Sequence, residues 1–323
     1  MREPTFDRRT LLGGAIAMGS IAFLEGRTMA KPQTGFFQKI GVPIGLQLYT
    51  LGDEAGHDLD ATFAQVAQIG YRDIELPNLY GKPARDVRAA ADRAGLRISS
   101  LHVPISPMGP TQGFSLASAP AQIADTVGAL GTDRVVAPIA LFPSNFRPQP
   151  GDSMQAAIGR AFASAGEEPW KRTATLLNER AAALKALNIS VGYHNHNLEF
   201  APIGKTCGWD ILARETDPHL VTFEVDVGWV VTGGRDPTAF LRKLKGRVAQ
   251  LHVKDVARSN TVNYALSMQP AEVGSGALNW KPILTAAYDA GVRHFYVEQE
   301  PPFSMPRIEA ARQSYAFLSQ LRA

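Results

Sequence analysis

The chain has 323 residues, of which 45% are hydrophobic and 20% are charged, and it contains 33 Lys and Arg against 30 Asp and Glu. This composition is typical of a globular protein with a large core, and it excludes a disordered chain. The formal net charge of +3 is spread along the chain without a basic cluster, so nucleic acid is not an expected partner. Cys207 is the single cysteine, which excludes an intramolecular disulfide.

Residues 1–30 differ from the rest of the chain and have the order of an export signal. Arg8 and Arg9 precede an uncharged, Gly/Ala-rich stretch, 11–24, and the small-residue sequence Thr28-Met29-Ala30 follows. Paired arginines favour the twin-arginine route, so we expect the twin-arginine export machinery as a partner and a periplasmic or secreted protein. The apolar stretch is shorter than the roughly 20 residues that span a bilayer, so no stable membrane span is expected after processing. A retained N-terminal anchor is the alternative.

From residue 41 onward, amphipathic helical patterns alternate with short β-rich runs, which predicts parallel βα architecture. The expected strands are 44–49, 73–76, 98–103, 134–137, 190–196, 221–227, 248–253 and 294–298. Asp236 and Pro237 form a cap and a first-turn proline, which predicts that a helix begins there. Eight such units predict a single-domain (β/α)8 TIM barrel over residues 31–323. A doubly wound sheet is the main alternative, but the first turn, 49–54, lacks its Gly-rich loop.

Four of the expected strands end in side chains that bind metals or move protons. Alternate residues of a strand face the same side, and the strand ends of a parallel barrel converge, so these side chains are expected to form one site. The pairs that share a face are His194 with His196, Glu224 with Asp226, His252 with Lys254, and Glu298 with Glu300.

Asp226, His252 and Glu298 supply two carboxylates and one imidazole from three consecutive strands. This set suits one divalent cation, with Mn²⁺, Co²⁺, Zn²⁺ and Mg²⁺ all open. His194, on the preceding strand, is the natural fourth ligand. Each residue alone could merely satisfy a backbone group, but their joint occurrence on successive strands favours a metal site.

The chain resembles the xylose-isomerase-like superfamily of (β/α)8 sugar (phosphate) isomerases and epimerases. The segments that carry this resemblance are 44–49, 192–200, 224–229, 251–255 and 297–300. It implies one divalent metal held from strands five to eight, with the eighth-strand role falling on Glu298. Epimerases of this superfamily have a glutamate where this chain has His194, so their symmetric two-glutamate proton transfer does not carry over. His196 matches an imidazole that relatives similar to dehydratases use.

The predicted enzyme is a sugar isomerase or epimerase that acts on a keto-sugar through an enediolate held by the metal. Glu298 or His196 is the predicted base. Further residues are predicted to contact the carbohydrate substrate: His102, Lys254, Glu199 and Trp229. For Lys254, a salt bridge with Asp255 or Glu300 is an equal alternative.

Three other functions are open. The first is a lyase or hydratase of the same fold that acts on 3-keto-glycosides by β-elimination, and export makes it more credible. The second is a nuclease related to abasic-site endonucleases, which would need more metal ligands and a basic face. The third is a non-catalytic sugar-binding barrel, which would bind a carbohydrate without turnover.

Overall fold

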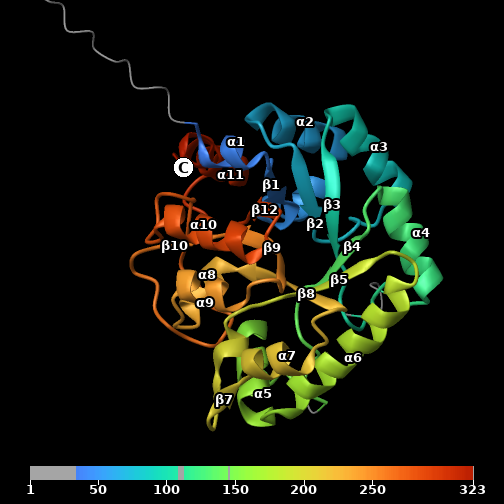
Figure 1. Cartoon of the computed structure of the whole chain (residues 1–323), viewed down its shortest axis with the longest axis vertical. Coiled ribbons are helices and arrows are strands. Elements are labelled where there is room, and N and C mark those ends of the chain that lie inside the picture. Colours follow the sequence, from blue (N-terminus) through green and yellow to red (C-terminus); the bar gives the residue numbers. More distant parts are fainter. Residues whose placement is uncertain (1–33, 108–112, 145, 323) are drawn as a thin grey trace, which may run out of the picture. The chain divides into compact units, whose positions relative to one another are not determined.

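The computed structural model describes residues 34–107, 113–144 and 146–322. Within these residues, eight parallel strands close into a barrel that helices surround (Figure 1). The strands are β1 (Ile44–Gln47), β2 (Asp73–Leu76), β3 (Arg97–His102), β4 (Arg134–Ala137), β5 (Ser190–His194), β8 (Val221–Asp226), β9 (Val248–Val253) and β12 (His294–Val297). The predicted (β/α)8 barrel is therefore confirmed, and the predicted export signal lies outside the described residues.

The barrel strands follow each other in chain order around the ring, and β1 pairs with β12 to close it. The helices are α1 (Phe36–Ile40), α2 (Leu59–Ile69), α3 (Ala84–Ala94), α4 (Pro120–Leu130), α5 (Met154–Ala165), α6 (Glu168–Lys185), α7 (Gly208–Glu215), α8 (Val227–Thr232), α9 (Pro237–Lys243), α10 (Trp280–Ala290) and α11 (Arg307–Gln320). The predicted start of α9 is confirmed, because Asp236 Oδ1 accepts a hydrogen bond from Ala239 N at 2.6 Å. The first and last helices lie together, with Phe36 N donating to Leu321 O at 2.7 Å (Figure 1).

Two short hairpins extend the loops that follow barrel strands. After β5, a 3-10 turn, η3 (Leu198–Phe200), leads to the pair β6 (Pro202–Ile203) and β7 (Thr206–Cys207). After β9, β10 (Asp255–Val256) pairs with β11 (Pro270–Ala271). A bilayer-crossing helix must be long and apolar, and the described residues contain none.

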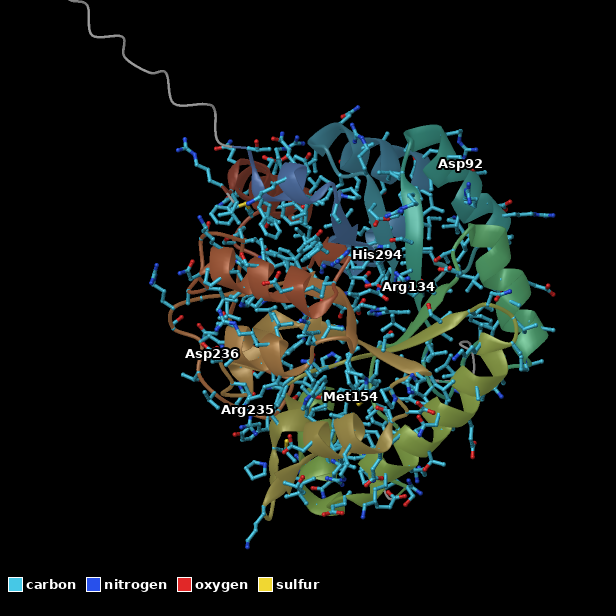
Figure 2. All side chains as sticks on the ribbon, viewed as in Figure 1. Asp92, Arg134, Met154, Arg235, Asp236 and His294 are labelled. Atoms are coloured by element: carbon cyan, nitrogen blue, oxygen red, sulfur yellow. The ribbon has the colours of Figure 1, made fainter. Side chains whose placement is uncertain are left out.

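The inside of the barrel is polar toward the carboxyl ends of the strands. Glu75 on β2 and Glu224 on β8 are fully buried there, and each directly follows a shift in strand register. Such irregularities change the direction in which a side chain points, so both carboxylates enter the barrel at its polar layer. Figure 2 labels Arg134 and His294, the first residues of β4 and β12, which mark the opposite, amino-terminal end.

Candidate metal centre and active site

The four predicted metal ligands lie together at the carboxyl end of the barrel. Each offers one ligand atom, and these atoms all lie within 4.8 Å of one another. All four side chains are buried, and they come from the ends of β5, β8 and β9 and the residue after β12. The residues are His194, Asp226, His252 and Glu298. Two imidazoles and two carboxylates at this spacing suit a divalent metal.

One oxygen of the Asp226 carboxylate caps a helix, and the other faces the cluster. Oδ1 caps α8 by accepting a hydrogen bond from Trp229 N at 2.9 Å. Oδ2 is buried and makes no hydrogen bond of acceptable geometry, although Lys254 Nζ lies 2.8 Å away as an ion pair. A buried carboxylate oxygen without a hydrogen bond is a natural ligand for a cation, so the donor set fits a metal.

Lys254 places a positive charge in the same cluster. Its fully buried Nζ lies 2.8 Å from Asp226 Oδ2, 2.8 Å from Glu298 Oε2 and 2.6 Å from Glu300 Oε1. Burial alone would lower the pKa of Lys254, but these three carboxylates raise it well above its usual value. The alternative pairing with Asp255 is wrong, because Asp255 instead accepts hydrogen bonds from Gly274 N and from the Trp280 indole.

Trp229 closes one side of the Lys254 charge cluster. Its indole Nε1 donates to Glu300 Oε1 at 3.2 Å, and the Lys254 ammonium lies 5.2 Å from the ring centroid. The Trp229 side chain is buried, with 2% exposed. Its observed contacts are therefore with the protein, and its predicted contact with substrate stays a prediction.

Two buried glutamates orient the histidine ligands from the side that faces the barrel interior. Glu75 Oε1 lies 2.7 Å from His252 Nε2, and Glu224 Oε1 lies 3.0 Å from His194 Nδ1. With these ring N–H groups donating to the glutamates, Nε2 of His194 would be free for a metal, and Nδ1 of His252 would become free once the charged ring loses its second proton. Nδ1 of His252 already lies 2.7 Å from Glu298 Oε2. Burial alone would raise the pKa of Glu298, but the Lys254 and His252 charges lower it, so the carboxylate is ionised.

His102 belongs to the same layer inside the barrel as Glu75 and Glu224, and it is not one of the four ligands. Its Nε2 lies 3.0 Å from Glu224 Oε1 and 3.2 Å from Glu75 Oε1. Although burial opposes it, the two carboxylates raise the pKa of His102 to about 10. Gln250 Nε2 completes the layer with bonds of 2.7 Å to Glu224 and 3.0 Å to Glu75. Glu75 and Gln250 were not predicted as site residues. The sequence signal that could have identified Glu75 is a carboxylate inside the short apolar run of β2.

We expect Glu75→Gln to weaken metal binding about 10–100-fold, because the oriented His252 loses its carboxylate partner. The measurement is a competition between the protein and a chromophoric chelator for Co²⁺, with the visible spectrum of the bound ion recorded. Asp73→Asn, on the same strand but paired with Arg97, is the matched control. An affinity and spectrum equal to those of the unmodified protein would contradict this role.

His196 is the imidazole of the site that has no hydrogen bond to its ring among the described residues. Its ring centroid lies 4.9 Å from that of His194 and 5.4 Å from that of Trp229. Burial, aided by the Lys254 charge, lowers the pKa of His196 to about 3, so the ring is neutral. The ring is partly exposed and makes no hydrogen bond among the described residues, so a ring nitrogen is free to face a substrate.

Glu199 supports the His196 backbone. It sits on η3, where its Oε2 accepts a hydrogen bond from His196 N at 3.0 Å and its Oε1 accepts one from the Tyr193 hydroxyl at 2.6 Å. Burial raises the pKa of Glu199 to about 7. With 1% of its surface exposed, Glu199 contacts protein groups, and its predicted contact with substrate stays a prediction.

Similarity to known proteins identifies the class to which this barrel belongs. Residues 63–321 match the family model described as xylose isomerase-like TIM barrel, so the chain belongs to that family. The crystal structure of a sugar phosphate isomerase/epimerase from Parabacteroides distasonis is 25% identical, with a TM-score of 0.66 over 87% of this chain and 94% of that one.

Curated relatives carry the name inosose dehydratase. The protein from Clostridium beijerinckii is 22% identical over 293 residues, which cover 83% of this chain and 92% of that protein. The protein from Clostridium tetani is 29% identical over 154 residues, and here the match spans 43% of this chain and about half, 51%, of the relative. The family is thus one of enzymes, with both dehydratases and isomerases or epimerases among the relatives.

Proposed function

We propose that this protein is a divalent-metal-dependent enzyme that removes the proton next to the carbonyl of a keto-sugar or keto-cyclitol and then eliminates a β-oxygen substituent. The observation that carries this proposal is the position of His196, whose ring has no hydrogen bond among the described residues and lies beside a buried cluster suited to a metal. The curated relatives named inosose dehydratase support elimination.

A divalent metal held by His194, Asp226, His252 and Glu298 would supply the electrophile that polarises the substrate carbonyl and acidifies the adjacent C–H. His196 takes that proton, and the C–H electron pair becomes a carbon–carbon double bond. The β-oxygen leaves with the electrons of its bond to carbon, and the imidazolium returns the proton to that oxygen. The Lys254 ammonium, held beside the cluster by Asp226, Glu298 and Glu300, would add positive charge near the oxygen that becomes negative.

Isomerisation or epimerisation is the second candidate, and the position of Glu298 favours it. Glu298 lies in one cluster with His194, whose ring is 4.9 Å from that of His196, so the site holds two groups that could exchange protons with one substrate carbon. The 25% identical structure from Parabacteroides distasonis supports this candidate. Both reactions share the first proton transfer, and they differ in where the proton goes next.

Product analysis separates the two. The metal-loaded protein is incubated in D₂O with keto-sugars, 3-keto-glycosides and keto-cyclitols, and the products are analysed by mass spectrometry and NMR. Elimination should give an unsaturated ketone and a released alcohol or water. An isomer or epimer that carries deuterium, without any released group, would favour the second candidate. No deuterium in any recovered compound and no product would contradict both.

We also propose that the protein is exported by the twin-arginine route and acts outside the cytoplasm. Replacing Arg8 and Arg9 together with Lys should abolish export, because this route recognises the paired arginines. Fractionation of bacterial cells expressing the full chain, with immunoblotting of the periplasm, measures the effect. Export that is unchanged in the double variant would contradict this route, and Arg2→Lys is the control.

A further inference from the structure

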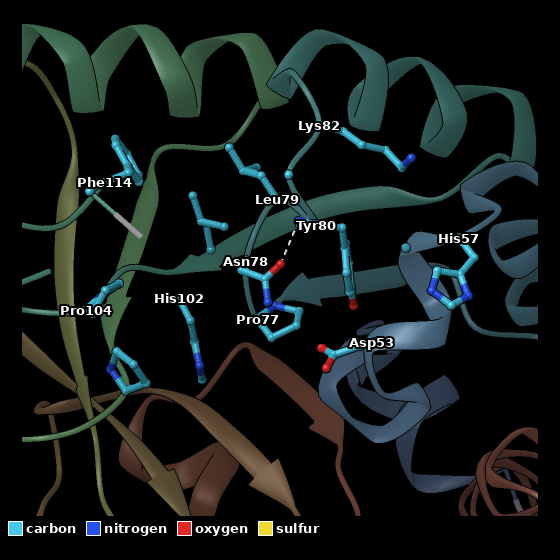
Figure 3. A pocket seen from close by; sticks show the side chains of 15 residues that line it. Asp53, His57, Pro77, Asn78, Leu79, Tyr80, Lys82, His102, Pro104 and Phe114 are labelled. Carbon is cyan, nitrogen blue, oxygen red and sulfur yellow. Dashed lines mark hydrogen bonds between the residues drawn. The ribbon is translucent and has the colours of Figure 1, made fainter. Parts of the chain in front are cut away.

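A cavity of about 640 Å³ opens beside the metal cluster, between η2 (Asp53–Gly56), the segment that follows β2 and the end of β3 (Figure 3). None of the four proposed metal ligands lines it, but His102 does. His102 also bonds Glu224, the carboxylate that orients His194. The cavity and the metal cluster therefore adjoin at His102, and a molecule that occupied both would extend across the barrel mouth.

The wall of the cavity has apolar and polar surface in similar amounts, and the volume lies within the usual range of small-molecule sites, about 300–1,000 Å³. The apolar part includes Leu79, Phe114 and three prolines, Pro77, Pro104 and Pro138. Carbohydrate rings present C–H faces to walls of this kind and hydroxyl groups to their polar positions.

Four polar side chains of this cavity have no hydrogen-bond or ion-pair partner among the described residues, and of these Asp53 and His57 are exposed and Lys82 is half-buried. The side chains of Asp53, His57 and Lys82 make no hydrogen bond or ion pair with any residue that the structure describes, and the buried Tyr80 hydroxyl also has no partner. Figure 3 shows these four side chains gathered on one side of the cavity. Unpaired donors and acceptors of this kind are available to a ligand, and a buried hydroxyl without a partner is unfavourable until one binds.

The local backbone holds Tyr80 in place. Asn78 Oδ1 accepts a hydrogen bond from Tyr80 N at 2.6 Å, and Tyr80 has a left-handed φ of 53°. A Cβ atom at Gly56 would come within 2.7 Å of Tyr80 Cβ, so this contact requires glycine. The base of the Tyr80 ring is thus held by its own turn and by η2 before any ligand arrives.

We propose that this cavity binds a second, uncharged, hydroxyl-bearing ring of the substrate, so that the enzyme acts on a glycoside and not on a sugar phosphate. This inference rests on the proposed function, because it assumes that the reacting keto-sugar lies at the metal cluster. The charges of Asp53 and Lys82 cancel, and a phosphate would meet the Asp53 carboxylate without the clustered cations that it needs. Neutral hydroxyl groups can instead accept from Lys82 and donate to Asp53.

Isothermal titration calorimetry on the metal-loaded full chain tests this inference without turnover. The probes are glucose, glucose 6-phosphate and a panel of α- and β-linked glucobioses. At least one glucobiose should bind about tenfold or more tightly than glucose, which is the gain from one or two further hydrogen bonds. Glucose 6-phosphate should bind no better than glucose.

Asp53→Asn and Lys82→Met should each reduce the glucobiose advantage and leave glucose binding unchanged. Lys39→Met, an exposed lysine on α1 outside the cavity, should keep the advantage. Equal binding of all glucobioses and glucose, tighter binding of glucose 6-phosphate, or variants without effect would overturn the inference. Proton exchange with keto-sugars would still stand in that case, whereas its absence with intact glucobiose binding would refute only the proposed reaction.

Discussion

Asp226→Asn is expected to abolish metal binding and proton exchange together. Loss of a partner that only orients a ligand already costs about 10–100-fold in metal affinity, so loss of a charged ligand should exceed about 100-fold. The fold should survive, because an asparagine can still cap α8 through its Oδ1 atom. Lys254 would keep Glu298 and Glu300 as charged partners.

Two measurements check this expectation: metal content per chain after dialysis, and deuterium incorporation into a keto-sugar. Asp236→Asn is the matched control, because Asp236 caps α9 in the same way and lies outside the cluster. The control should match the unmodified protein in both measurements. One metal per chain in Asp226→Asn, at unchanged affinity, would show that this carboxylate is not a ligand.

His196→Gln should slow proton exchange by about 10²–10⁴-fold, which is the usual contribution of a positioned general base. Metal affinity should stay unchanged, because His196 lies beside the four ligands and not among them. Slow exchange at unchanged metal affinity would identify His196 as a base, because loss of a metal ligand would lower the metal affinity as well. Exchange is read by NMR in D₂O at saturating metal.

His219→Gln serves as the control for this second variant, since His219 is an exposed histidine that precedes β8, at the opposite end of that strand from Asp226. Its exchange rate should equal that of the unmodified protein. Should His196→Gln exchange at the full rate, the base would have to be another group, with Glu298 next in line. A loss of metal in His196→Gln would instead make His196 a ligand.

The barrel could be predicted from the sequence because its signals are local. Each strand is a short apolar run bounded by turn residues, and the predicted and observed strand ends differ by no more than two residues. Helix α5 was not predicted, because it lies inside the long connection after β4, where no strand-helix alternation marks it. The hairpin of β6 and β7 was missed for a similar reason, since two-residue strands carry no periodicity.

The cluster could be predicted in part. His194, Asp226, His252 and Glu298 sit at strand ends, and alternation along each strand determines which side chains share a face. Glu75 could not be placed in the same way, because its direction depends on a register shift that is a property of strand pairing. The three carboxylates around Lys254 likewise come from other parts of the chain, Asp226 from the end of β8 and Glu298 and Glu300 from the segment after β12, and only the closed barrel brings them to β9.

The four clustered side chains at the mouth of this barrel are proposed to hold one divalent cation. Crystals of the protein grown with Mn²⁺ and measured at an anomalous wavelength test this proposal most directly. We expect one strong anomalous peak per chain, in contact with His194, Asp226, His252 and Glu298. Crystals that give no peak there, or a peak bound by other residues while Lys254 stays paired with Asp226 and Glu298, would contradict it.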